Sequence, residues 1–530
     1  MTTIRRVYLY LGAFIGLSAS VAGVIALIAL IVDQGFDAFR GFSISGSAAV
    51  LALIIAGGIT WRFFWRTIQR EANAAPEERA SGMRKLYLYG TLTISLLIAL
   101  ILIQQVLGEL LVRAFDLGLN GYKPWTPLLS AAALLLVWRW HDWIALTDRA
   151  ANADGTRGGD LRRGYWFALT LFGVSGAASG LATFISGLLS HVGGQAPSPF
   201  GFSDSGVTWM QTLLPSLAQM AVSAFVLWMF WLPSHKAAAS GDEAERSSRA
   251  RSLLIHLVVF WATVWALGGA QGVLTDVLNR LLSGFSSSPL VLTVNGPLSL
   301  LIVGGLLLVY FFKQVRPTLV TLRLSDYIIA GVAFFIAVFG VQLLVAALFQ
   351  ALGGQGPRIE TLIPNILPGL LVGGVVWRWR WQRLETETSS PDGAPARSYL
   401  WRKVYLHFYQ LVGVILMLVG GVAVLQQIIS SILGQPSPGN ALSNLSIPLS
   451  FLLVGSGLMI YMTQIVATDS RLGALSVEEV MQFTLGDAAP TWAIAALVAF
   501  VIGPVFTIVM LALLGPVIGN IFSNIVGGLD

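Results

Sequence analysis

The sequence predicts an all-α, polytopic integral membrane protein. We expect a bundle of about 13 transmembrane helices, arranged as six repeated two-helix hairpins plus a C-terminal helix. Three observations lead to this fold class. Hydrophobic residues make up 55% of the 530 residues and charged residues only 11%, whereas an ordinary globular protein has about 25% charged residues. The mean hydropathy is +0.76. Apolar stretches of roughly 20 residues, long enough to cross about 30 Å of hydrocarbon, recur along the chain.

The apolar stretches account for most of the chain. The segments between them are short and polar, and they are too short to form soluble domains. The first stretch follows Arg5 and Arg6 and so resembles a signal peptide, but it is also the first helix of a repeated unit, and we expect it to be retained. The thirteen stretches cover approximately residues 7–32, 44–66, 86–107, 126–146, 165–189, 208–232, 252–274, 292–313, 327–351, 361–381, 404–429, 446–468 and 489–514.

Basic residues open six similar units at intervals of 74 to 87 residues. The hexapeptides that begin at Arg5, Arg84 and Arg402 read RRVYLY, RKLYLY and RKVYLH. Such self-similarity indicates internal duplication. The predicted hairpin repeats span residues 1–83, 84–161, 162–248, 249–322, 323–401 and 402–488, and residues 489–530 form the C-terminal transmembrane helix and an outer tail.

The second helix of each hairpin carries its own repeated feature. In five hairpins a proline is followed thirteen residues later by an aromatic residue, and in the first hairpin alanine replaces the proline. Thirteen helical residues span about 20 Å, so the aromatic residue is expected near a membrane interface, where amphipathic rings are favoured. The pairs are Ala48/Trp61, Pro127/Trp140, Pro215/Trp228, Pro297/Tyr310, Pro364/Trp377 and Pro448/Tyr461.

Lys and Arg concentrate on one side of the predicted membrane. The hairpin junctions, the N-terminus and the adjoining helix ends hold 27 of the 32 basic residues. The positive-inside rule therefore places the N-terminus and the junctions in the cytoplasm and the C-terminus outside the inner (plasma) membrane of the cell. The net charge of +6 reflects this topology, and we expect no nucleic-acid partner.

An aromatic-basic motif closes several second helices on the junction side. It reads WRFFWR from Trp61, WRWHDW from Trp138 and WRWRWQR from Trp377. Tryptophan rings favour headgroup depth and arginine can hold lipid phosphates bidentately. The motif predicts a membrane belt with snorkelling arginines or, more specifically, a site for an anionic lipid such as cardiolipin. The residues of this lipid-binding prediction are Trp61, Arg62, Arg66, Arg139, Trp140, Trp377, Arg378, Arg380 and Arg383.

Polar residues toward the outer ends of the first helices are mostly glutamines. Gln105, Gln271, Gln342 and Gln427 recur there, and three of them share one helical face when the repeats are aligned. They predict either a polar cavity or amides that join neighbouring helices by hydrogen bonds.

Two histidines, His256 and His407, are the ionisable residues within the helix interiors. They occupy places where other repeats have Tyr or Phe. One interpretation is a pair of axial haem ligands; the other is an interfacial side chain that substitutes for tyrosine. We favour the second interpretation and expect no cofactor and no metal.

Small-residue pairs recur within the apolar stretches. They are Gly12/Gly16, Gly176/Gly180 and Gly369/Gly373. Such pairs let helix backbones approach closely, and we expect them to pack helices within the chain.

Signatures of enzymes are absent from the sequence. It contains no Cys, no His-Glu-x-x-His, no Walker loop and no Gly-x-Ser-x-Gly. The helix interiors also lack the charged residues of a proton relay. We expect a non-catalytic scaffold or accessory subunit of a membrane assembly, with anionic membrane lipids and other membrane proteins as partners. The alternative is a transporter or channel for a small apolar, zwitterionic or lipid-like substrate.

The hexapeptide openings within repeated two-helix units resemble a group of bacterial multi-pass membrane proteins, the domain of unknown function 5671. The resemblance is strongest over residues 1–150 and 399–470 and weaker around Arg251 and Arg323. It implies a bacterial inner membrane location. It implies no activity and no catalytic residue.

Overall fold

In the computed structural model, long α-helices make up almost all of the described part of the chain. No strand occurs in the ranges that it describes, so the all-α fold class is confirmed. The described residues are 3–34, 44–115, 117, 124–151, 156–193, 209–282, 290–314, 319–354, 356, 358–390, 393–433 and 440–472.

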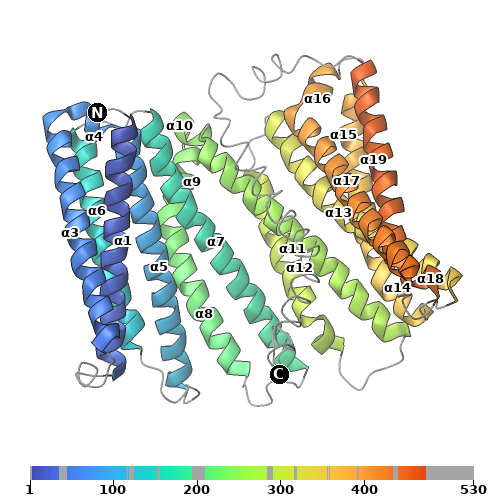
Figure 1. The fold of residues 1–530 in the computed structure, drawn as a ribbon, viewed down its shortest axis with the longest axis horizontal. Coiled ribbons are helices and arrows are strands. Elements are labelled where there is room, and N and C mark those ends of the chain that lie inside the picture. The colour runs from blue at the N-terminus through green and yellow to red at the C-terminus, as the bar shows by residue number, and fades with distance from the viewer. Residues whose placement is uncertain are drawn as a thin grey trace. The chain divides into compact units, whose positions relative to one another are not determined.

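Six pairs of long helices, named here pair 1 to pair 6, follow one another along this part of the chain (Figure 1). The first helices of the pairs are α1 (Thr3–Gln34), α5 (Gly82–Ala114), α7 (Thr156–Val192), α11 (Arg249–Leu282), α13 (Leu319–Leu352) and α17 (Leu400–Ile432). The second helices are α3 (Ile44–Ala74), α6 (Trp125–Ala151), α8 (Trp209–Val226) continued by η1 (Leu227–Trp231) and α9 (Leu232–Ala239), α12 (Leu290–Gln314), α14 (Ile359–Pro368) continued by η2 (Gly369–Gly373) and α15 (Gly374–Thr388), and α19 (Ser446–Arg471). The short helices are α4 (Pro76–Arg79), α10 (Glu243–Arg246), α16 (Ala394–Ser398) and α18 (Ala441–Asn444).

Eleven spans within the described ranges are long and apolar enough to cross a membrane, which is the pattern of a multi-pass membrane protein. Helix α6, predicted as the fourth span, is not among them because its second half carries Arg139, His141 and Asp142. The thirteenth predicted span, residues 489–514, lies outside the described residues. The count of about 13 therefore stays a prediction.

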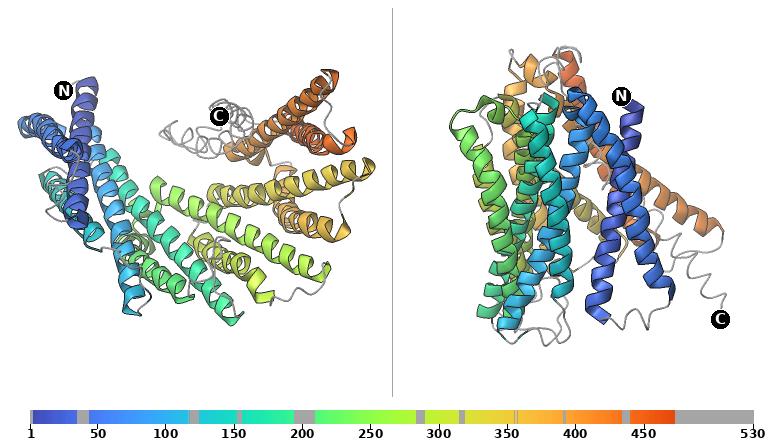
Figure 2. Two further views of the ribbon diagram at one scale, coloured as in Figure 1. Left: turned by 60° about the horizontal axis from the view of Figure 1, so that its bottom comes forward. Right: turned by 90° about the vertical axis from the view of Figure 1, so that its left-hand side faces the viewer.

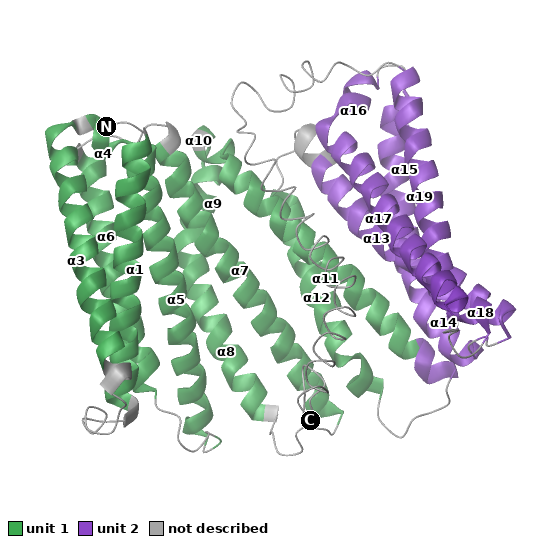
Figure 3. Ribbon diagram, in the orientation of Figure 1, with its two compact units in different colours: residues 1–277, 285–316 green, residues 278–284, 317–530 purple. Residues whose placement is uncertain are grey.

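The chain divides into two compact units (Figure 3). The first comprises Met1–Val277 with Phe285–Arg316, and the second comprises Leu278–Gly284 with Pro317–Asp530. The division falls within a few residues of the predicted boundary between the fourth and fifth hairpins.

The two helices of a pair pack closely where one of them carries a glycine. In pair 1, a Cβ atom added to Gly57 would lie 2.6 Å from the backbone nitrogen of Ser20. In pair 5, a Cβ atom added to Gly373 would lie 2.6 Å from the backbone nitrogen of Ala337. Real Cβ atoms do not approach so closely, so these positions accept only glycine without a shift of the helices. Gly373 was among the glycines predicted to pack helices within the chain.

Successive pairs within a unit are joined in a regular way. The first helix of one pair contacts the second helix of the next: α1 contacts α6, α5 contacts α8, α7 contacts α12, and in the second unit α13 contacts α19. The right-hand view of Figure 2 shows the long helices of the first unit running roughly parallel to one another. Each of these four first helices, α1, α5, α7 and α13, is therefore covered on two sides, by its own partner and by the next pair.

Three of the second helices carry prolines inside the helix, whereas Pro127 and Pro448 lie in the first turns of α6 and α19. Pro215 lies within α8, Pro297 within α12, and Pro364 and Pro368 within α14. A proline removes one N–H from the helical hydrogen-bond ladder. The π-helical turn η2 begins directly after Pro368, as expected where the ladder is locally rearranged.

Candidate functional site

Three helices of the first unit meet around a buried arginine, which we call the first arginine cluster: Trp61, Trp65, Arg84, Tyr87 and Asp148. Arg84 lies in the first turn of α5, and its backbone N–H is capped by Ser81. Its Nε donates to Asp148 Oδ2 at 2.6 Å and its Nη2 to Asp148 Oδ1 at 3.2 Å. The guanidinium lies 5.7 Å from the ring centre of Trp65, and Tyr87 stacks on the same ring. Arg84 is 1% exposed.

The second unit contains a matching group, the second arginine cluster: Trp377, Trp381, Arg402, Tyr405 and Asp469. Arg402 Nε donates to Asp469 Oδ2 at 2.7 Å and Nη2 to Asp469 Oδ1 at 3.0 Å. Its guanidinium lies 5.4 Å from the ring centre of Trp381, on which Tyr405 stacks. Arg402 is also 1% exposed.

The two clusters agree in the order of their residues along the chain and in geometry. Position 65 corresponds to 381, position 84 to 402 and position 148 to 469. In both clusters the two tryptophans stack with their ring centres 6.5 Å apart. One chemical difference stands out: Arg84 Nη2 reaches the neutral Gln69 at 3.4 Å, whereas Arg402 Nη2 reaches the carboxylate of Glu385 at 3.0 Å.

Pairs 3 and 4 build a related group with different partners for the arginine. Arg251, in the first turn of α11, lies 4.7 Å from the ring centre of Trp231. Its Nη1 donates to the hydroxyl of Ser234 at 3.1 Å, and Ser234 donates to Glu245. Trp231 Nε1 donates to Tyr310 at 3.0 Å. A hydroxyl therefore contacts the arginine here, and the carboxylate of Glu245 accepts from that hydroxyl.

A one-turn helix precedes each of these arginines at the same distance. Helices α4, α10 and α16 begin eight residues before Arg84, Arg251 and Arg402 respectively. Glu78 of α4 accepts a bidentate contact from Arg6, and Glu245 of α10 accepts from Arg163. These carboxylates connect the junction to the first helix of the preceding pair.

A buried arginine with a bidentate carboxylate joins helices rather than offering a reactive group. Its Nε and Nη2 donors are directed at the acid, and removal of either partner leaves an uncompensated charge in a low-dielectric environment. Within the described residues, no group of three or more His, Cys, Asp or Glu could hold a metal ion.

Eight of the nine residues of the lipid-binding prediction are exposed arginines or half-buried tryptophans. The side chains of Arg62, Arg66, Arg378 and Arg383 are exposed, and Arg139 is exposed beside Asp142 at 3.4 Å. Trp61, Trp140 and Trp377 are half-buried; Trp61 packs against Trp140, and Trp377 packs against Trp381.

Arg380 differs from its neighbours on α15. Its Nη1 donates to Asp326 of α13 at 2.6 Å, and its guanidinium lies 4.2 Å from the ring centre of Trp379. The structure therefore assigns Arg380 to helix packing within the second unit.

The predicted glutamine positions do not share one environment. Gln342 is buried and donates to Ser450 of α19 at 2.9 Å, as expected of an amide that joins helices. Gln105 is exposed, while Gln271 and Gln427 are half-buried.

Both histidines have a contact for Nδ1 on their own helix. His256 is buried, and its Nδ1 lies 2.7 Å from the carbonyl oxygen of Ser252. His407 is exposed, and its Nδ1 lies 2.7 Å from Gln410 Oε1.

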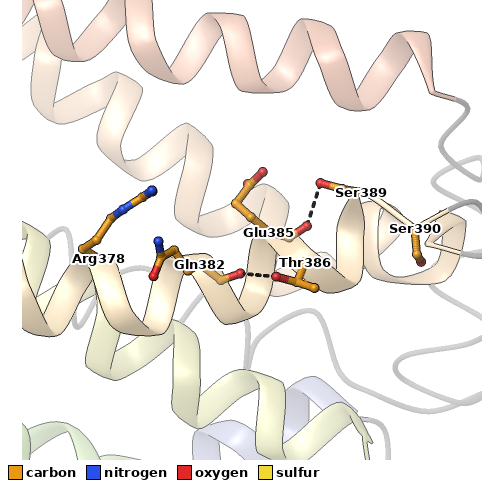
Figure 4. Close-up of a pocket in the computed structure, with 6 residues that line it drawn as sticks. All are labelled: Arg378, Gln382, Glu385, Thr386, Ser389 and Ser390. Atoms are coloured by element: carbon orange, nitrogen blue, oxygen red, sulfur yellow. Dashed lines mark hydrogen bonds between the residues drawn. The ribbon is translucent and has the colours of Figure 1, made fainter.

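One open hollow of about 720 Å³ lies along the end of α15 (Figure 4). Arg378 and Glu385 project to the same side of the helix there. Glu385 is also the second acid on Arg402, so the hollow borders the second arginine cluster. The lining residues are Arg378, Gln382, Glu385, Thr386, Ser389 and Ser390.

Sequence reasoning missed the acids that pair with the arginines of the two clusters. Asp148 follows Trp140 by eight residues, and Asp469 follows Tyr461 by eight. That shared spacing, added to the proline–aromatic pairs, was the signal that could have identified them.

Comparison with known proteins gives one family match. The family model described as "Domain of unknown function (DUF5671)" matches residues 6–132, 201–306 and 323–457. No curated protein matches the chain. No solved structure matches it.

Proposed function

The chain belongs to the family described as domain of unknown function (DUF5671), and from that premise we propose that it is a non-catalytic membrane scaffold, or accessory subunit, of a membrane assembly. One observation carries the proposal. The buried arginines of both units are directed at acids on another helix, Arg84 at Asp148 and Arg402 at the partly buried Asp469, and these pairs join helices. The charged side chains of the two arginine clusters therefore hold the protein's own helices together.

We propose further that the chain is a tandem array of six hairpins, and that these form three four-helix modules. The regular contacts between first and second helices support the array. The arginine groups at Arg84, Arg251 and Arg402, each preceded by a one-turn helix, support the grouping of pairs 1–2, 3–4 and 5–6. The first and third segments of the family match cover most of pairs 1–2 and pairs 5–6.

The array is oriented in an inner membrane with its basic ends in the cytoplasm. The positive-inside rule supports this orientation. The arginine clusters would then lie at the cytoplasmic interface, with the exposed arginines of α3 and α15 at headgroup depth. Those exposed arginines contact anionic lipids.

The lipid contacts are tested by a pair of variants on α15. In the double variant Arg378→Ala and Arg383→Ala, two exposed guanidinium groups are lost, and we expect several-fold less anionic lipid to co-purify, measured by native mass spectrometry. Arg380→Ala is the control, because Arg380 is engaged by Asp326 and its loss should leave the retained lipid unchanged. If the double variant and the Arg380→Ala control retain equal amounts of anionic lipid, the proposed lipid contacts are wrong.

The scaffold function itself is tested by affinity purification of the tagged chain in polymer nanodiscs, followed by mass spectrometry. An unrelated multi-pass protein purified in the same way is the control. The proposal predicts specific membrane-protein partners at stoichiometric levels. If the chain has no such partners and transports a substrate into proteoliposomes, the scaffold proposal is contradicted and the transporter alternative is favoured.

A further inference from the structure

Helices α5 and α17 are equivalent, yet they are covered differently. Arg84 and Tyr87 of α5 correspond to Arg402 and Tyr405 of α17, a constant difference of 318. By the same difference, Leu96 and Leu100 correspond to Val414 and Leu418.

These equivalent positions are buried on α5 and exposed on α17. Leu96 and Leu100 are 7% and 5% exposed, and they belong to the same core cluster as Val222 and Val226 of α8 in the next pair. Val414 and Leu418 are 38% and 61% exposed. The face that receives the next pair on α5 is therefore open on α17 within the described residues.

Helix α13 gives an independent register for the same face. A Cβ atom on Gly373 would meet Ala333 and Ala337 of α13, and one on Gly455 would meet Gly413 and Met417 of α17. Positions of α13 thus correspond to positions of α17 that are numbered 80 higher.

By this register, the side of α13 that contacts pair 6 corresponds to the open face of α17. Phe334 packs on Tyr409, and Gln342 donates to Ser450. Their equivalents on α17 are Val414 and Val422, which are 38% and 49% exposed.

The open face is one continuous apolar stripe. Its members recur at intervals of three or four residues, so they lie along one side of the helix. We call it the α17 stripe: Leu411, Val414, Leu418, Val422, Leu425 and Ile429, each between 38% and 61% exposed.

We propose that residues 489–514 of the same chain cover the α17 stripe. This stretch contains no Asp, Glu, Lys or Arg and is long enough to cross the hydrocarbon. Between the predicted apolar stretches it is preceded by residues 469–488, a linker about as long as the earlier junctions between such stretches. It therefore stands, in sequence, where the first helix of a next pair would stand, and first helices of neighbouring pairs do contact each other, as α5 contacts α7.

The sequence of this stretch complements the stripe. Small residues recur at every fourth position over five positions, a row that lets another helix approach closely. Bulky side chains on α17 would pack against this row as ridges pack into grooves. The small residues are Thr491, Ala495, Ala499, Gly503 and Thr507.

Cysteine cross-linking tests the proposal directly, because the chain has no native Cys. Leu418→Cys is combined with Ala499→Cys in the full-length chain, with a protease site placed between residues 473 and 488. After mild oxidation and cleavage, we expect the two fragments to stay together on a non-reducing gel and to separate on reduction. Leu425→Cys with Thr507→Cys tests the same contact at a second depth.

Matched pairs control for random collision. Val501 lies two residues from Ala499 and so points to the other side of a helix; Leu418→Cys with Val501→Cys should yield separated fragments. So should Ala499→Cys with Ile55→Cys on α3, where Ile55 is 60% exposed. Separated fragments for both test pairs would overturn the proposal and would indicate that lipid covers the α17 stripe. A disulfide-linked dimer of the single Leu418→Cys variant would overturn it in favour of a second copy of the chain.

Discussion

Asp148→Ala is expected to destabilise the protein by about 3–5 kcal/mol, the usual cost of leaving one member of a buried ion pair alone. Arg84 is almost fully buried and its other polar contact is the neutral Gln69. After the substitution, the guanidinium has lost the carboxylate that balanced its charge. The measurement is the midpoint of unfolding in denaturant, for the purified protein in mild detergent.

The second arginine cluster supplies the matched comparison. Asp469→Ala removes the equivalent acid, but Glu385 still contacts Arg402 at 3.0 Å, so the loss should be clearly smaller. Gln69→Glu, added to Asp148→Ala, places an acid where the second cluster has Glu385 and should restore part of the stability. No loss of stability in Asp148→Ala would show that the ion pair does not hold the helices. Equal losses at the two aspartates, with no rescue by Gln69→Glu, would show that a second acid does not compensate for the first.

Gly57→Ala should cost about 1–3 kcal/mol through overpacking between α1 and α3. The new methyl group would lie 2.6 Å from the backbone nitrogen of Ser20, which cannot move without its helix. Gly373→Ala should behave alike against Ala337 in the second unit. Thermal unfolding of the purified variants measures the effect.

The adjacent glycines are controls with an expected opposite sign. A Cβ atom on Gly58 would meet no atom closer than 3.6 Å, and one on Gly374 would meet none within 4 Å. Alanine at these positions should stabilise the helix by about 0.5–1 kcal/mol, because glycine loses more conformational freedom on folding. If Gly57→Ala and Gly58→Ala shift the unfolding temperature alike, the close approach of α1 and α3 is wrong.

The fold class was predictable because hydrocarbon imposes its length on every span. An apolar run such as residues 404–429 identifies a helix regardless of its neighbours, and α17 contains it. The near-copies at Arg84 and Arg402 also predicted that these two places resemble each other, and their bonding is indeed alike.

The use of individual residues was much less predictable. Arg62 of α3 and Arg84 of α5 both lie toward the junction between pairs 1 and 2, yet one is exposed and the other buried. The difference lies in Asp148, which is 64 residues from Arg84 in sequence. In a helix that is apolar on all sides, the sequence pattern also does not distinguish the packed face from the face toward lipid. Trp65 is 7% exposed while Phe63, two residues earlier, is 66% exposed, and both had the same role in the predicted membrane belt.

The central claim is that every pair enters the membrane in the same direction, with its basic end in the cytoplasm. Single cysteines in the otherwise Cys-free chain test it by labelling with an impermeant maleimide in intact spheroplasts. Exposed positions at the basic ends are Ala80, Ser240 and Ser389, and exposed positions at the opposite ends are Leu281, Leu352 and Leu433. The account predicts labelling of the second set in intact spheroplasts and of the first set only after permeabilisation. Labelling of Ala80, Ser240 and Ser389 from different sides of the membrane would contradict it.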